Sequence, residues 1–135
     1  MRFPHLYSLV KPLSNLEPKM GSTGDVDNGA DIDLVAVGQF DSGLALCQIG
    51  AATGAPTSFS VAWKIQDSTD GVTWVDVAGA SLTMTAAGVG KIDFFPSQLK
   101  EHVRLVRSVT ITGGTSPRVP SAGVILLGGG RTIPA

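Results

Sequence analysis

The stretch that most constrains the fold is residues 57–77, TSFSVAWKIQDSTDGVTWVDV, whose pattern is typical of a β-hairpin. Large apolar side chains occupy every second position of its first half: Phe59, Val61, Trp63 and Ile65. Smaller or polar residues stand between them. This period of two is expected of a strand that buries one face and leaves the other toward solvent.

A turn and a second strand complete the predicted hairpin. Residues 67–71 (DSTDG) carry carboxylate and hydroxyl side chains that can bond nearby backbone, and a glycine that tolerates positive φ. Residues 72–77 then form the second strand, with Trp74 packing back toward the first. Because both tryptophans lie in this unit, we expect them in the core. The alternative is that Trp63 and Trp74 face solvent and bind carbohydrate.

The rest of the chain repeats short strand patterns at intervals of about 8–12 residues, separated by Gly and Pro turns. We therefore predict an all-β fold: a single antiparallel β-sandwich, jelly-roll or immunoglobulin-like, of about eight short strands. The last strand is apolar on both faces, which places it centrally or at a subunit contact. Besides the hairpin, the predicted strands are 32–40, 44–49, 81–85, 91–95, 102–112 and 119–127, with one helical turn within 96–101.

Arg107 interrupts the apolar face of the predicted strand 102–112. An arginine that faces a core must be paired, and Asp76 or Asp93 is the expected partner. A bulge that turns Arg107 outward is the alternative.

Charge is scarce in this chain. Of its 135 residues 16% are charged and 43% hydrophobic, whereas an average soluble protein has about 25% charged residues. A surface with so little charge favours association. The net charge of -1 provides no general attraction to nucleic acid or to an acidic membrane. Neither a transmembrane helix nor a signal peptide is predicted.

The sequence divides into residues 1–31, an extended N-terminal arm followed by an Asp/Gly loop; residues 32–128, the sandwich body; and residues 129–135, a short tail. Pro4, Pro12 and Pro18 prevent a persistent helix in the arm, yet it is rich in large apolar residues. It either covers an edge of its own sheet or lies on a neighbouring subunit, and we favour the second. Its predicted contact residues are Phe3, Leu6, Tyr7, Leu9, Val10, Leu13 and Leu16.

Signals of catalysis or metal binding are weak. The single Cys47 reads as a small strand residue, and His5 and His102 have no companions at metal-ligand spacing. The Asp-rich loop places Ala30 and Ala36 where a calcium-binding EF-hand needs glycine and a carboxylate. We therefore expect no enzyme, no catalytic residues, no metal site and no cofactor.

Four segments carry a resemblance to a known family. They are the end of the hairpin (IQDSTDGVTWVDV), residues 102–107 (HVRLVR), residues 111–117 (ITGGTSP) and residues 121–128 (SAGVILLG). Together they resemble the small β-sandwich virion proteins of tailed bacteriophages, over about residues 32–128.

The resemblance implies a structural role. Such proteins are typically capsid decoration or cement proteins, often trimeric, that sit on the outer capsid surface and stabilise it by bridging capsomers. It implies the major capsid protein and neighbouring copies, as a homotrimer, as partners, with no nucleic acid and no membrane. The alternatives are a tail- or fibre-associated structural module and a carbohydrate-binding β-sandwich on the virion surface.

Overall fold

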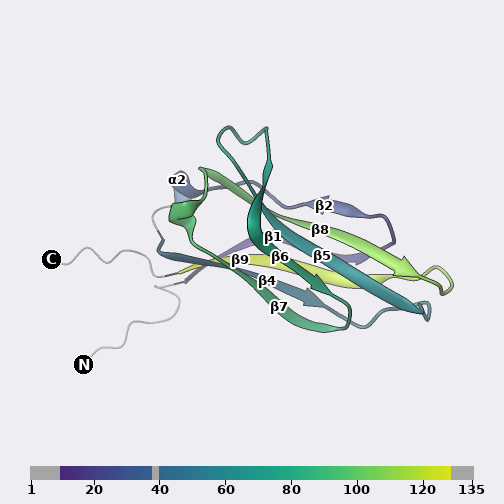
Figure 1. Cartoon of the computed structure of the whole chain (residues 1–135). Coiled ribbons are helices and arrows are strands. Elements are labelled where there is room, and N and C mark those ends of the chain that lie inside the picture. Colours follow the sequence, from purple (N-terminus) through teal and green to yellow (C-terminus); the bar gives the residue numbers. More distant parts are fainter. Residues whose placement is uncertain (1–9, 38–39, 129–135) are drawn as a thin grey trace, which may run out of the picture.

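The computed structural model describes residues 10–37 and 40–128, which form a sandwich of two antiparallel sheets (Figure 1). One sheet has the order β1-β9-β4-β7 and the other the order β2-β8-β5-β6, with β3 also pairing with β8. The predicted all-β sandwich is confirmed. The strands are β1 (Val10–Gly21), β2 (Val26–Asn28), β3 (Ile32–Asp33), β4 (Ser42–Ile49), β5 (Ser58–Ser68), β6 (Val75–Met84), β7 (Gly88–Phe94), β8 (His102–Thr112) and β9 (Val119–Gly128).

The predicted hairpin is present as β5 and β6, but its second strand begins later and runs further. Asp70 accepts hydrogen bonds from the backbone N–H groups of Val72 and Thr73, both at 2.8 Å, which holds these residues in the connecting loop. A register shift then lets β6 continue to Met84, because Gln66 pairs with Asp76 whereas Lys64 pairs with Ser81. The two strands predicted at 72–77 and 81–85 are therefore one bulged strand.

The core lies between the sheets and is built from the inward positions of both. Trp63 is 1% exposed and packs among the aliphatic residues of β8 and β9. Gly123 in β9 makes room for it, since a Cβ there would come within 2.6 Å of Leu105 Cδ2 and 3.2 Å of Trp63 Cζ3. The prediction that the last strand is central is confirmed, because β9 pairs with β1 on one side and β4 on the other (Figure 1).

The arm prediction needs correction for residues 10–21, which form β1 in the chain's own sheet. Leu16 is 4% exposed in the core, and Leu13 packs against it. The physical reason is the edge of β9: β1 supplies hydrogen-bonding partners to its backbone there and buries Leu16 in the core. The strand includes Val10, whereas the predicted contact residues Phe3, Leu6, Tyr7 and Leu9 lie outside the described residues.

Residues 32–40 also differ from the prediction of a single strand. Strand β3 ends at Asp33, and the short helix α2 (Leu34–Val37) follows. The Asp33 carboxylate accepts hydrogen bonds from the N–H groups of Val35 and Ala36, at 3.0 and 3.2 Å. Such a cap satisfies N–H groups at a helix start and so ends the strand. The helical turn predicted within 96–101 is confirmed as the 3₁₀ helix η1 (Pro96–Gln98).

Candidate functional site

The two outer faces of the sandwich differ in chemistry. On the face formed by β8, β5 and β6, most outward positions carry hydroxyl, amide or charged groups; Ala62 and the buried Val106 are the apolar exceptions. Pairing of the strands brings these groups onto one outer face. We call it the polar face; its residues are Ser60, Ala62, Lys64, Gln66, Ser81, Thr83, Arg104, Ser108 and Thr110.

The opposite outer face carries an apolar stripe along β4 and β9. The odd-numbered residues of both strands point into the core, so the even-numbered ones point outward. The register places Leu44 opposite Leu126 and Leu46 opposite Val124. These side chains are half-buried by one another and keep part of their surface exposed. The apolar stripe consists of Leu44, Leu46, Pro120, Ala122, Val124 and Leu126.

Charged residues border part of this stripe. On the β7 side, Lys91 and Asp93 are exposed and form an ion pair at 3.4 Å. On the β1 side, Lys19 turns away from the stripe and pairs with Asp25 and Asp27 at the β2 edge. The stripe is therefore a narrow, half-buried apolar surface about two strands wide.

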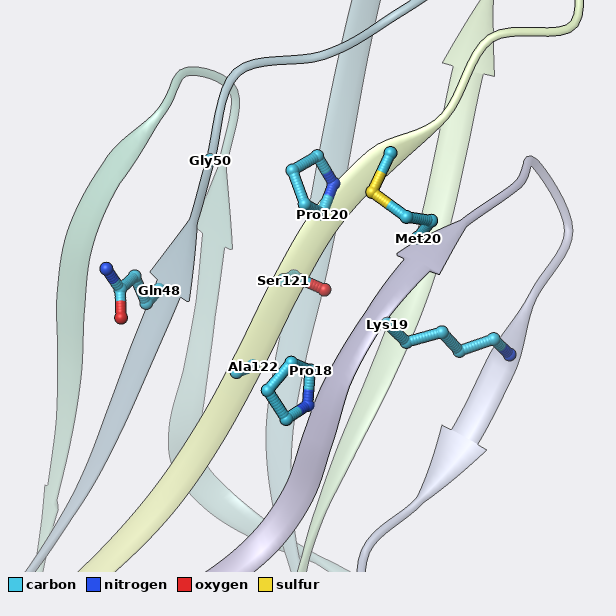
Figure 2. Close-up of a pocket in the computed structure, with 8 residues that line it drawn as sticks. All are labelled: Pro18, Lys19, Met20, Gln48, Gly50, Pro120, Ser121 and Ala122. Carbon is cyan, nitrogen blue, oxygen red and sulfur yellow. The ribbon is translucent and has the colours of Figure 1, made fainter.

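A hollow of about 380 Å³ lies at one end of the stripe, between β1, β9 and β4 (Figure 2). The Pro120 ring and the Met20 side chain lie next to each other on its border, and Met20 is 48% exposed. Its surface is mainly carbon, so it can receive an apolar side chain. The lining residues are Pro18, Lys19, Met20, Gln48, Gly50, Pro120, Ser121 and Ala122.

Beneath this hollow, Arg107 is 2% exposed and faces the interior. Its Nη2 lies 3.1 Å from Asp27 Oδ2, and its Nη1 donates to Ser121 O at 3.0 Å. A carboxylate pairs with this arginine as predicted, but the expected partners were wrong. Asp76 instead pairs with Lys64, and Asp93 with Lys91. Asp27 was missed because its segment reads as a surface loop.

The charge of Asp27 is stabilised by its neighbours. Burial acts to raise the pKa of this carboxyl, but hydrogen bonds from Lys19 and Arg107 outweigh burial and hold the pKa below its usual range. The ionised carboxylate therefore compensates the buried guanidinium. This polar cluster links β8, β2 and β9 at the edge of the sandwich beside the stripe.

The tryptophans do not form a pair of exposed rings. Trp63 is buried, so it is excluded as a platform for sugar binding. Trp74 is half-buried outside the strands, and the Arg104 guanidinium carbon lies 4.3 Å from its ring centroid. A cation so close to the ring covers one of its faces. The prediction of a core position is confirmed for Trp63 and wrong for Trp74, which lies in the loop before β6.

Cys47 is the small buried strand residue that was predicted, and burial raises the pKa of its thiol to about 12. His102 Nδ1 lies 3.0 Å from Asp31 Oδ1. Within residues 10–37 and 40–128, no group of three or more His, Cys, Asp or Glu side chains could hold a metal ion. The same ranges contain no helix that is both long and apolar enough to cross a membrane.

Comparison with known proteins gives a likeness of fold. No family model matches the chain, and no curated protein matches it. The crystal structure of the PBSX exported protein XepA matches with a TM-score of 0.61 at 10% identity, over 99% of this chain and 42% of that chain. PirA matches with a TM-score of 0.44 at 11% identity, over 89% of this chain and 91% of that chain.

A virus protein is also among the similar structures. Desmodium yellow mottle tymovirus matches with a TM-score of 0.46 at 10% identity, over 94% of this chain and 84% of that chain. The chain spans less than half the length of XepA, and the likeness to XepA at this identity shows the sandwich fold alone.

Proposed function

We propose that the chain is a structural virion protein of a tailed bacteriophage, of the capsid decoration or cement type. It binds the outer capsid surface and stabilises the shell by bridging capsomers. The observation that carries the proposal is the apolar stripe on one outer face of a sandwich whose other outer face is polar. Such asymmetry suits a protein whose apolar face is attached to a partner and whose polar face is exposed to solvent.

The stripe has the properties of a contact surface. Its residues belong to two paired central strands, so binding requires little loss of backbone freedom. Lys91 and Asp93 at its border provide polar contacts around an apolar centre, the usual arrangement of protein interfaces. When many copies bind a symmetric lattice, contacts that are weak individually give a high overall affinity.

The proposed partners are the major capsid protein and neighbouring copies of this chain, arranged as a homotrimer. The proposal assigns no catalysis, cofactor, nucleic acid or membrane to the chain. It is supported by the resemblance of residues 32–128 to phage virion proteins and by the low charge of the sequence. Burial of Trp63 weighs against the alternative of a two-tryptophan carbohydrate site.

The test is binding to capsids of the parent phage that lack this protein, followed by electron microscopy. We expect saturable density on the outer capsid and a higher temperature of capsid disruption. Leu46→Lys, in the centre of the stripe, is expected to weaken capsid binding roughly tenfold, since it places a charge on the apolar side of the protein that is attached. Ser81→Lys on the polar face is the matched control and is expected to bind normally.

Two outcomes contradict the proposal. Density on the tail or fibres with a bare capsid assigns the chain to the tail instead. Capsids that gain no stability when the chain is bound exclude a cement role. Circular dichroism of each variant checks that the sandwich remains folded.

A further inference from the structure

The size of the apolar stripe indicates what covers it. From Pro120 to Leu126 along β9 is six residue steps, or about 20 Å, and two strands with their side chains span about 10 Å. The stripe thus covers about 200 Å² in projection, whereas a stable interface between two proteins buries about 800 Å² on each partner. Its dimensions match a single extended segment better than the face of a second sandwich.

A segment of suitable length and composition precedes β1. Residues 3–9, FPHLYSL, span about 20 Å when extended and contain four large apolar side chains. In an extended chain Phe3, Tyr7 and Leu9 share one side because side chains alternate. The segment leads into Val10, which pairs with Gly128 just beyond the Leu126 end of the stripe.

The position of Val10 favours a neighbouring copy over the chain's own stripe. To return over its own sheet, the chain has to reverse immediately before β1, and a tight turn takes about four residues. That turn would consume residues 6–9 and remove Leu6, Tyr7 and Leu9 from the stripe. A segment that continues in the direction of β1 carries all of them beyond the end of its own sandwich.

We propose that residues 3–9 of one copy lie on the apolar stripe of a neighbouring copy, with one apolar side chain in the hollow beside Pro120 and Met20. The inference rests on the proposed function, since a lattice or trimer is what places copies side by side. It assigns the direct partner of the stripe: a second copy of this chain, contributed as an extended segment. The capsid then meets this outer face around the stripe and over the segment that fills it.

The test is photocrosslinking from the segment in the full-length chain. Tyr7 is replaced by p-benzoylphenylalanine, and unlabelled chains are mixed with ¹⁵N-labelled chains. The mixture is irradiated both free and bound to capsids, and crosslinked peptides are identified by mass spectrometry. We expect crosslinks between isotopically different copies, mapping to β4 and β9 at Leu44, Leu46, Ala122 or Val124.

A matched pair of variants makes the assignment specific. Val124→Lys is expected to lower the yield of crosslinks between copies roughly tenfold, because it puts a charge under the segment. Ser81→Lys, on the polar face, is expected to leave the yield unchanged. The thermal unfolding transition of both variants shows whether the sandwich is intact.

Other outcomes overturn the inference. These are crosslinks confined within one copy, crosslinks to the α2–η1 end around Val35 and Phe95, or no crosslinks in either state. The proposed function and this inference are overturned by different results. A chain that binds capsids without crosslinks between copies loses the inference and keeps the function. A chain with such crosslinks that never binds capsids loses the function.

Discussion

The side-chain oxygen of Asn15 in β1 accepts a hydrogen bond at 2.7 Å from the backbone N–H of Leu105 in β8. The amide nitrogen of Asn15 donates to Ala30 O at 2.6 Å. The register shift between Ser14 and Leu16 turns this residue inward, where it is 6% exposed. One side chain therefore ties the first strand of one sheet to the central strand of the other.

Replacing Asn15 by Ala should destabilise the sandwich by about 3 kcal/mol, because a buried N–H and a carbonyl both lose their partner. Urea unfolding followed by tryptophan fluorescence measures this. Asn28→Ala, at an exposed position in β2, is the control and should cost less than about 0.5 kcal/mol. Equal midpoints for the two variants would contradict the structural role of Asn15.

The Arg107–Asp27 pair leads to a second prediction. Arg107→Met removes the guanidinium from four buried or half-buried acceptors on Asp27, Ser121 and Glu17. We expect a loss of about 3–5 kcal/mol, as is typical when one member of a buried pair is removed. Lys64→Met breaks a surface pair with Asp76 and should cost less than about 1 kcal/mol. If chemical denaturation shows only a small loss in the free energy of unfolding for Arg107→Met, the stabilising role of the Arg107–Asp27 pair is contradicted.

Stability should fall in acid partly through Asp70. Hydrogen bonds from the backbone N–H groups of Thr73 and Val72 and from the Ser68 hydroxyl lower the pKa of this carboxyl to about 2. A folded-state pKa below the unfolded value gives stability that is present above about pH 4 and is lost as the pH falls through about 2.

The Asp70→Asn variant isolates this contribution. Its melting temperature should lie below that of the wild type at pH 5, and the difference should shrink toward pH 2. Thermal unfolding between these pH values provides the measurement. Asp93→Asn, in an exposed ion pair, is the control. If the difference in melting temperature between the wild type and Asp70→Asn does not change with pH, the low pKa of Asp70 is not a source of stability.

Cys47 should be unreactive while the chain is folded. It is fully buried in β4, and burial raises the pKa of its thiol to about 12, so very little thiolate forms at pH 8. Iodoacetamide at pH 8 should modify it slowly in buffer and rapidly in denaturant, as mass spectrometry can follow. Rapid alkylation of the native chain would show that β4 opens readily.

Strand alternation made much of the fold predictable. The pattern in 102–112 matches β8 at both ends, and the doubly apolar pattern of 119–127 correctly gave β9 a central place. The same signal pointed to half of the stripe, since Ala122, Val124 and Leu126 form the second apolar side of that strand. Local periodicity is informative here because each strand buries a regular set of positions.

The remainder depends on contacts between distant residues. Asp27 lies 80 positions from Arg107, and Asn15 lies 90 positions from Leu105, so neither partner can be read from local spacing. Residues 10–21 contain prolines and lack a strict alternation of apolar and polar residues. The sequence pattern therefore did not predict that they form a strand. The early end of β3 depends on one capping carboxylate, Asp33, within an otherwise strand-like segment.

The polar face has a consequence for the whole particle. If the apolar stripe contacts neighbouring molecules on the capsid, the polar face around Ser81, Thr83 and Thr110 becomes the surface that is exposed to solvent and to antibodies. Most groups on this face are neutral, and Lys64 is paired with Asp76, so the face should hold water well and attract few ions. If the proposed function holds, capsids that carry this protein should resist aggregation over a wide range of salt, and peptides displayed from the β5–β6 loop should be freely accessible.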